Sequence, residues 1–411
     1  MSAQIQKRTT KFLLLFAVFN LGLNYLWISY NALFLPEQVL KAFSPSLRSL
    51  MLGAIASGGV AMGVLTNLMS GIFSDGLNTR FGKRRPLIIA GVAGLIPVMI
   101  LVAVEPYFSF IVAAEYIAMQ IFSNLAQGSY QPLLPDLIPK EQRGEAGGFL
   151  GLYMLIGNAM GYGISGMLVG NNELPTASIL VLLVLLITTA ISLYAIWGHD
   201  VGYQGKSRSF FQSFKKIFKP DTRSEGFFWL VAGTFFVLIG SSGLMYFELY
   251  YFKYVLKLQN PAYGVAITGL VVLVIAMIAS VLLGNLSDKY GRKRILIYTA
   301  IAGGASMATI PFLKTFYTFL IAAAMVGATT GVFSSVEAAF AGDLSPSSET
   351  GQYMAYSNLA IGGSSAAAPI LDGLIIYLEG GSILLGFLLM FLVSAVFYFI
   401  GAGFLLKTPN A

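Results

Sequence analysis

The chain has 411 residues, of which 56% are hydrophobic and only 10% are charged, and its formal net charge is +7. Since a soluble domain carries roughly 25% charged residues, this composition excludes an ordinary water-soluble fold and predicts a membrane protein. The absence of cysteine excludes disulfides, thiolate metal sites and thiol redox chemistry.

Twelve apolar runs follow one another, each long enough to cross a bilayer, which takes about 20 mostly apolar residues. The runs are continuous and lack the alternation of membrane barrel strands. The first run is too long for a secretory signal and is treated as a retained span. We therefore predict an all-α integral membrane protein with spans at 12–36, 46–75, 87–105, 108–135, 147–169, 176–198, 227–254, 263–287, 295–313, 315–341, 352–378 and 383–406.

The basic residues predict the orientation of these spans, because Lys and Arg concentrate on the cytoplasmic side. With both termini on one side, that side receives 20 of the 25 Lys and Arg residues. We therefore expect a multi-pass protein of the cell membrane with both termini in the cytoplasm. Orientation in the bilayer explains the positive charge, so no nucleic-acid partner is expected.

The second half of the chain repeats landmarks of the first. The turn "SDGLNTRFGKRRP" (74–86) corresponds to "SDKYGRKR" (287–294), and "PDLIPKEQRG" (135–144) corresponds to "GDLSPSSETG" (342–351). The members of the first pair follow the second span of their half, and those of the second pair follow the fourth, so the halves run in the same sense. For such parallel repeats a substrate site is expected near the midplane between the halves. The predicted domains are a six-helix bundle at 1–198, a basic linker at 199–226 and a second six-helix bundle at 227–411.

Within the linker, "SFFQSFKKIFKP" places Phe211, Phe214 and Phe218 on one helical face, with lysines elsewhere. This pattern fits a short helix lying in the anionic inner surface of the membrane. A disordered basic linker fits the same residues.

The two basic turns resemble the signature loops of the major facilitator superfamily, and the resemblance covers essentially the whole chain. The resemblance implies two pseudo-symmetric six-helix bundles, transport by alternating access, and a conformational latch that favours the outward-open state. A cluster that only fixes orientation is the alternative. The residues that the latch would use are Gly71, Asp75, Arg80, Gly82, Arg84, Asp136, Arg143, Gly284, Asp288, Gly291 and Arg292.

The first turn is longer than the second, and with "NLAQGSYQPLLPDL" (124–137) it resembles the sucrose-carrier-type and glycoside-pentoside-hexuronide branches. At positions where plant sucrose carriers have an aspartate and an arginine, this chain has Gln120 and Gln131. The resemblance therefore does not supply a charged sugar-binding pair or the usual proton site.

Polar side chains form one stripe on each of two predicted spans. Amides beside an aromatic ring suit a polyhydroxylated, uncharged ligand, because they supply donors and acceptors while the ring covers an apolar sugar face. Amides that join neighbouring spans are the alternative. The candidate substrate-binding residues are Asn20, Asn24, Trp27 and Asn31 on the first span and Tyr116, Gln120, Asn124, Gln127 and Gln131 on the fourth.

Four acids fall within the predicted spans, where a charge costs about 2.5–3.5 kcal/mol or more. A carboxyl group at such a depth can take up a proton from one side and release it to the other. The best candidate for coupling is Glu337, followed by Glu248, Glu115 and Asp372. A structural hydrogen bond, or a sodium site of carboxylates and amides, is the alternative for each.

These features favour a proton-coupled symporter of a sugar or glycoside, expected to be a monomer without a cofactor. The first alternative is a proton-driven exporter of drugs, lipids or other metabolites on the same fold. The second is a transporter-shaped assembly factor or sensor. No nucleotide-binding loop, nucleophile motif or metal-ligand cluster is found in the sequence, so an enzyme is not expected.

Overall fold

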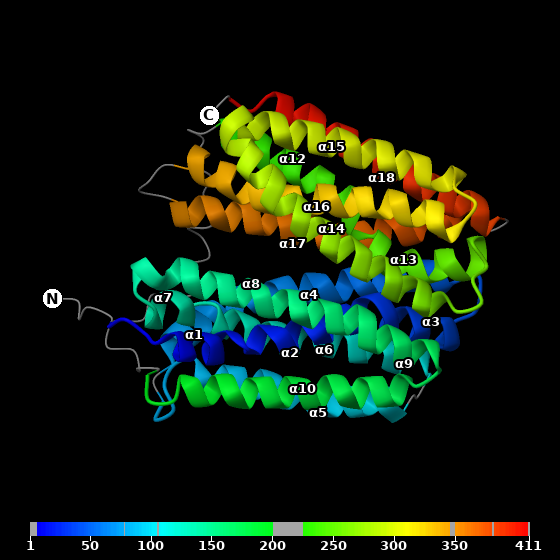
Figure 1. The fold of residues 1–411 in the computed structure, drawn as a ribbon. Helices are drawn as coiled ribbons and strands as arrows, with labels where there is room; N and C mark the ends of the chain where they lie inside the picture. Colours follow the sequence, from blue (N-terminus) through cyan, green and yellow to red (C-terminus); the bar gives the residue numbers. More distant parts are fainter. Residues whose placement is uncertain are drawn as a thin grey trace. The chain divides into compact units, whose positions relative to one another are not determined.

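The computed structural model describes residues 6–77, 79–104, 107–199, 225–345, 350–379 and 382–409, and every regular element within these ranges is a helix (Figure 1). In the first half of the chain the helices are α1 (Thr10–Ala17), α2 (Phe19–Ser29), α3 (Leu35–Ala42), α4 (Arg48–Gly76), α5 (Arg85–Val104), α6 (Ser109–Tyr130), α7 (Leu133–Leu137), α8 (Arg143–Met160), α9 (Gly166–Gly170) and α10 (Leu174–Ala195). In the second half they are α12 (Glu225–Ser242), α13 (Leu244–Tyr250), α14 (Pro261–Tyr290), α15 (Arg292–Thr309), α16 (Phe316–Leu344), α17 (Thr350–Leu378) and α18 (Ile383–Leu406).

Twelve stretches of these helices are long and apolar enough to cross a membrane, which confirms the predicted span count. The last span, Ile383–Leu406, has the predicted boundaries. The first extends to Ala42, beyond the predicted end at residue 36, because a π-helical turn, η1 (Tyr30–Phe34), connects α2 to α3 without a break.

Several spans begin at a side chain that caps the helix. The Thr9 hydroxyl accepts from the Phe12 amide at 3.2 Å before α1, and Asn260 Oδ1 accepts from the Tyr263 amide at 3.2 Å before α14. Ser382 does the same before α18. Such caps satisfy amides that the first helical turn leaves without an internal partner, so these three spans begin at a defined residue.

The helices form two compact units, one of residues 1–42 and 58–215 and the other of residues 43–57 and 216–411. The segment 43–57 was predicted to belong to the first half but groups with the second unit. The reason is close packing on α17, where the Ile370 amide donates to Ser57 Oγ at 2.8 Å and Gly373 lies against the Ser49 carbonyl. The predicted linker 199–226, with its proposed surface helix, lies almost entirely outside the described residues.

Each unit pairs its spans in the same way, as the repeat in the sequence predicts. In the first unit α2 packs on α8 and α10, while α5 packs on α6 and α10 (Figure 1). In the second unit the corresponding α12 packs on α17 and α18, while α15 packs on α16 and α18. The two halves therefore share one internal arrangement.

The glycines of the two basic turns have nearly the same positive φ angle. Gly82 has φ +90° and Gly291 has φ +93°. Residues with a Cβ rarely adopt this region. The paired glycines of the sequence motif are therefore explained by the turn that leads from the second span of each unit into the third.

Candidate functional site

The polar stripe of α6 forms a hydrogen-bonded relay in the first unit. The Tyr116 hydroxyl donates to Asn31 Oδ1 on η1 at 3.0 Å and accepts from Gln120 Nε2 at 2.8 Å. Gln120 Oε1 in turn accepts from Asn124 Nδ2 at 3.2 Å. The spacing of four residues places these side chains on successive turns of one helix face, so the relay runs along α6.

The relay continues onto α4 because that helix approaches α6 closely at Gly63. A Cβ at Gly63 would lie only 2.6 Å from Asn124 Nδ2, so a larger residue there would displace the Asn124 amide. One turn further along α4, Asn67 Nδ2 donates to Asn124 Oδ1 at 3.4 Å. The relay thus joins the first, second and fourth spans.

The polar stripe of the first span contributes to the same region at two positions. Asn31 belongs to the relay, and Trp27 Nε1 donates to Ser123 Oγ on α6 at 3.1 Å. Asn24 Nδ2 donates to the Asn20 carbonyl at 2.8 Å, and Asn20 Nδ2 donates to the Leu150 carbonyl on α8 at 3.3 Å. These two asparagines therefore make contacts with backbone and lie outside the relay.

The last two glutamines of the α6 stripe also lie outside the relay. Gln127 is partly buried, and its Oε1 has no hydrogen-bond partner among the described residues. Gln131 is exposed at the end of the helix, where its backbone amide bonds the Gln127 carbonyl. Of the nine predicted binding residues, four form the relay and Trp27 packs beside it.

Glu337 on α16 is buried in the second unit, with 3% of its surface exposed. The Ser357 hydroxyl on α17 donates to Glu337 Oε1 at 2.7 Å, and the Thr234 hydroxyl on α12 donates to the same oxygen at 3.4 Å. Two neutral donors and no cation hold this carboxyl group in the part of the chain that the structure describes. Glu337 therefore connects α16 to both α12 and α17.

Glu248 and Asp372 are also buried in the second unit. Glu248 lies on α13, and its Oε1 has no hydrogen-bond partner among the described residues. Asp372 Oδ2 lies where a Cβ of Gly243 would be, only 1.6 Å from the ideal position. Gly243 lies between α12 and α13, and the absence of a Cβ there makes room for the Asp372 carboxyl group.

Glu115 is buried in the first unit with a side-chain amide as its partner. Gln38 Nε2 on α3 donates to Glu115 Oε2 at 2.7 Å. Its partner lies on α3, which contributes no residue to the relay. Among the described residues, no group of three or more Asp, Glu, His or Cys side chains gathers that could hold a metal ion.

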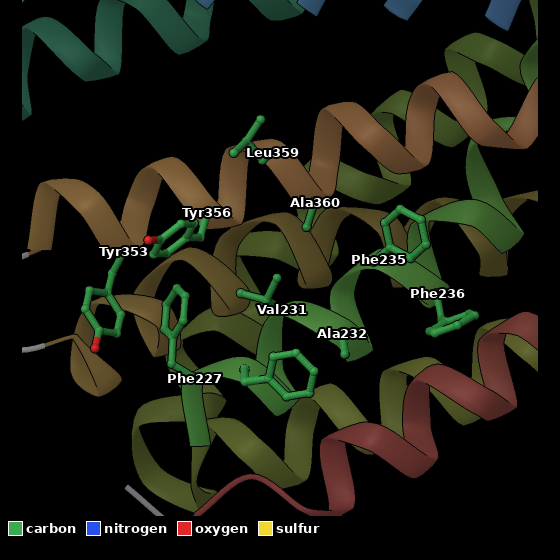
Figure 2. A pocket seen from close by; sticks show the side chains of 10 residues that line it. Phe227, Val231, Ala232, Phe235, Phe236, Tyr353, Tyr356, Leu359 and Ala360 are labelled. Atoms are coloured by element: carbon green, nitrogen blue, oxygen red, sulfur yellow. The ribbon is translucent and has the colours of Figure 1, made fainter. Parts of the chain in front are cut away.

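A cavity of about 440 Å³ lies between α12 and α17 in the second unit. Its lining is almost entirely apolar, and Figure 2 shows the rings of Phe227, Phe235 and Tyr356 between the two helices. Thr234 and Ser357, which hold Glu337, come from the same stretches of α12 and α17 as the lining residues. The volume lies within the ~300–1,000 Å³ of small-molecule sites.

The first basic turn connects the ends of two spans through a buried arginine. Arg84 is 3% exposed and donates to Asp136 Oδ2 from Nε and Nη2, both at 3.3 Å. Its Nη1 donates to the Gly71 carbonyl at 3.1 Å and to Ser74 Oγ, and Lys83 Nζ lies 2.9 Å from Asp136 Oδ2. The Arg84 side chain therefore ties the end of α4 to α7.

The second basic turn repeats this arrangement with greater exposure. Arg292 Nη2 lies 3.0 Å from Asp288 Oδ1, and its Nη1 pairs with Asp343 at the end of α16. Arg292 also donates to the Ala339 carbonyl at 3.0 Å. In both units an arginine after the paired glycine reaches the aspartate that ends the fourth span of that unit.

The other predicted latch residues have local roles. Arg80 is exposed and lies over the Phe81 ring at 4.7 Å, and Arg143 donates to the Ile138 and Pro135 carbonyls. A Cβ at Gly284 would lie 4.0 Å from Ser335 Oγ, in ordinary contact. Asp75 belongs to α4, and its side chain lies outside what the structure describes.

Sequence reasoning missed several residues that complete these sites. Asn67 is an isolated amide in its span, and Gln38 lies beyond the predicted end of the first span. Thr234 and Ser357 are two of several hydroxyl side chains in their apolar runs. The polarity of these residues within membrane spans was the available signal, but only the packing of the helices shows which partners they meet.

Comparison with known proteins places the chain in a family. A family model described as MFS/sugar transport protein matches residues 13–380, which is most of the chain. This match confirms the resemblance to the major facilitator superfamily that the basic turns indicated.

Two curated relatives have different activities. The chain is 22% identical over 286 residues to the multi-drug resistance efflux pump PmrA homolog of Lactococcus lactis subsp. lactis (strain IL1403), covering 69% of each protein. It is 25% identical over 176 residues to the general alpha-glucoside permease of Schizosaccharomyces pombe (strain 972 / ATCC 24843), covering 38% of this chain and 31% of the permease.

Two solved structures share the fold over nearly the whole chain. One is a bacterial homolog of the human lysosomal transporter Spinster, with a TM-score of 0.74, 14% identity, and 98% of this chain and 100% of that one covered. The other is a D-xylose-proton symporter, with a TM-score of 0.69, 16% identity and 97% of each chain covered. At these identities the likeness concerns the fold alone.

Proposed function

The chain belongs to the MFS/sugar transport protein family, and we propose that it is a proton-coupled symporter that carries a sugar or glycoside by alternating access. As a member of this family it is a multi-pass membrane transporter, and its fold is that of transporters rather than enzymes. The proposal concerns the substrate, the direction of transport and the coupling ion.

The observation that carries the choice of substrate is the relay on α6. Asn31, Tyr116, Gln120 and Asn124 offer amide and hydroxyl groups that both donate and accept. Trp27 beside them is partly exposed, so its ring is available to cover an apolar sugar face. An uncharged polyhydroxylated ligand can replace bonds within the relay with bonds of its own.

The coupling step is assigned to buried acids, with Glu337 first and Glu248, Glu115 and Asp372 as further candidates. Glu337 is held by two neutral hydroxyl donors on two different spans. Loss of its proton would strengthen both contacts, because an ionised acceptor makes the stronger hydrogen bond. Proton binding at Glu337 can therefore change how α12 and α17 pack on α16. Sodium is the alternative coupling ion.

The two basic turns are proposed as the conformational latch. Two ion pairs support this proposal, one between Arg84 and Asp136 and one between Arg292 and Asp343. Each joins the basic turn of its unit to the end of the fourth span. The excess of basic residues on one predicted side supports a cell-membrane location with both termini in the cytoplasm. A monomer is proposed because the amide relay is complete within one chain.

An exporter of apolar small molecules is the second candidate, and the cavity between α12 and α17 favours it. Phenyl and phenol rings line this cavity and suit an apolar or cationic guest. The 22% identity to a multi-drug resistance efflux pump supports the same reading.

Thermal-shift measurements on purified protein distinguish the two candidates. Two panels of compounds, one of mono- and disaccharides and one of hydrophobic cations, are tested for stabilisation. Each panel is measured on the wild type, on Tyr116→Phe and on Phe235→Ala. Symport of a sugar predicts stabilisation by a sugar that Tyr116→Phe weakens and Phe235→Ala does not. Stabilisation by hydrophobic cations alone, sensitive to Phe235→Ala, would instead establish the exporter.

A further inference from the structure

Two buried oxygen atoms on neighbouring helices of the first unit have no hydrogen-bond partner among the described residues. They are Oε1 of Glu115 on α6 and Oε1 of Gln38 on α3. The two side chains are 2% and 1% exposed, and they are already joined by the 2.7 Å bond from Gln38 Nε2 to Glu115 Oε2. An ionised carboxylate with an unsatisfied oxygen at such a depth is costly.

One proton satisfies both oxygen atoms. Carboxyl and amide groups are planar, and each carries its two polar atoms on one carbon. When the bond from Nε2 to Oε2 uses the amide hydrogen on the Oε1 side and the two planes align, the two Oε1 atoms face each other. Without a proton these oxygens are two acceptors with no donor between them. With a proton on Glu115, its O–H donates to Gln38 Oε1 and closes a cyclic pair with two hydrogen bonds.

We propose that Glu115 and Gln38 bind one proton between them as such an acid–amide pair, and that this pair is a proton-binding site of the first unit. Its use in coupling rests on the proposed symport, whereas the binding of the proton does not. Gln38 is a positioning residue here, because it holds the acid and accepts its proton without itself titrating.

The surroundings of the pair contain little compensating charge. On η1, Tyr30 lies close enough to Glu115 for an electrostatic interaction, and its hydroxyl has no hydrogen-bond partner among the described residues. On α3, Lys41 is 3.6 Å from Glu37 and donates to the Tyr107 hydroxyl, so its charge already has partners. On α5, which also packs on α6, the one ionisable residue is Arg85 at the opposite end. No cation faces Glu115 from these elements.

The pair also adjoins the substrate relay. Tyr30 precedes Asn31, its ring lies 5.7 Å from the Tyr116 ring, and Tyr116 follows Glu115 directly on α6. Glu115 and Tyr30 are therefore the direct chain neighbours of the two residues that form the hydrogen bond between Tyr116 and Asn31.

Infrared difference spectroscopy of the full chain in lipid nanodiscs, without substrate, tests the proposal. The protein is labelled with ¹³C-glutamate, so that glutamic-acid carbonyl bands separate from that of Asp372. The expected result is a carbonyl band of a protonated glutamic acid that is absent in Glu115→Gln and shifted in Gln38→Leu. This band should disappear on alkalinisation with the loss of one proton per chain. Glu173→Gln, at an exposed turn, is the matched control and should leave the band unchanged.

Three results would overturn the proposal. The first is a wild-type spectrum from which Glu115→Gln removes no such band. The second is a Glu115 band that persists at every pH at which the protein stays folded, since the acid would then be structural. The third is loss of the band on adding sodium chloride but not choline chloride, which would make the pair a sodium site. If Glu115→Gln does not fold, the shift in Gln38→Leu decides. None of these readings depends on whether a sugar is transported.

Discussion

The hydroxyl of Ser357 on α17 donates a 2.7 Å hydrogen bond to Oε1 of Glu337 on α16, and Thr234 on α12 donates to the same oxygen. Three spans of the second unit therefore meet at one buried carboxyl group. A protonated acid and an ionised one differ in how strongly they hold such donors, so the charge of Glu337 affects the packing of these spans.

Glu337→Gln should abolish uptake driven by a pH gradient in proteoliposomes while leaving substrate exchange partly intact. The amide keeps an acceptor for Ser357 but cannot carry a proton. Uptake of labelled substrate with and without the gradient measures both activities. Glu173→Gln, at an exposed turn, should behave as the wild type. Gradient-driven uptake that survives in Glu337→Gln would remove this residue from the coupling role.

Tyr116→Phe in the relay, and Asn24→Ala and Gln127→Ala on the polar stripes outside it, should each weaken substrate binding without unfolding the bundle. A lost neutral hydrogen bond costs about 1 kcal/mol, which corresponds to about fivefold in Kd. Isothermal titration with the sugar identified in the thermal-shift screen measures the change, and Gln259→Ala in an exposed turn is the control. If all three variants bind as the wild type does, the amide stripes are structural.

Arg84→Ala should destabilise the first unit more than Arg80→Ala. Arg84 is buried and holds Asp136, Gly71 and Ser74, whereas Arg80 is exposed in the same turn. Hydrogen bonds to charged groups contribute about 1.5–3 kcal/mol, so the unfolding temperature in detergent should fall clearly for Arg84→Ala alone. Equal unfolding temperatures for the two variants would show that the Arg84 contacts do not stabilise the unit.

Gly82→Ala and Gly291→Ala should each destabilise by about 1–3 kcal/mol, because both positions have a positive φ that residues with a Cβ rarely adopt. The matched control is Gly147→Ala in α8, where a Cβ meets no neighbouring atom and the helix gains about 0.5–1 kcal/mol from the substitution. Thermal unfolding compares the three variants. A Gly82→Ala protein as stable as the Gly147→Ala protein would contradict the strained turn.

The number of spans and their approximate positions could be predicted from the sequence because long apolar runs mark them, whereas the end of the first span at Ala42 could not. The shared arrangement of the two units followed from the repeated turns. The sequence could not show why the seventh span has a glycine at Gly243, since the space there is occupied by the Asp372 carboxyl group from α17. It also could not place Gln38 beside Glu115 or Asn67 beside Asn124, because these contacts depend on a π-helical turn and on a close approach of two helices at Gly63.

The most direct test of the proposed symport is an uptake assay in proteoliposomes that contain no sugar at the start. Uptake of the sugar that stabilises the purified protein is measured with an imposed inward proton gradient. The proposed function predicts that the sugar accumulates above its external concentration, that a protonophore abolishes the accumulation, and that replacing sodium with choline does not. A sugar that only equilibrates, or that leaves the vesicles when the gradient is applied, would contradict it.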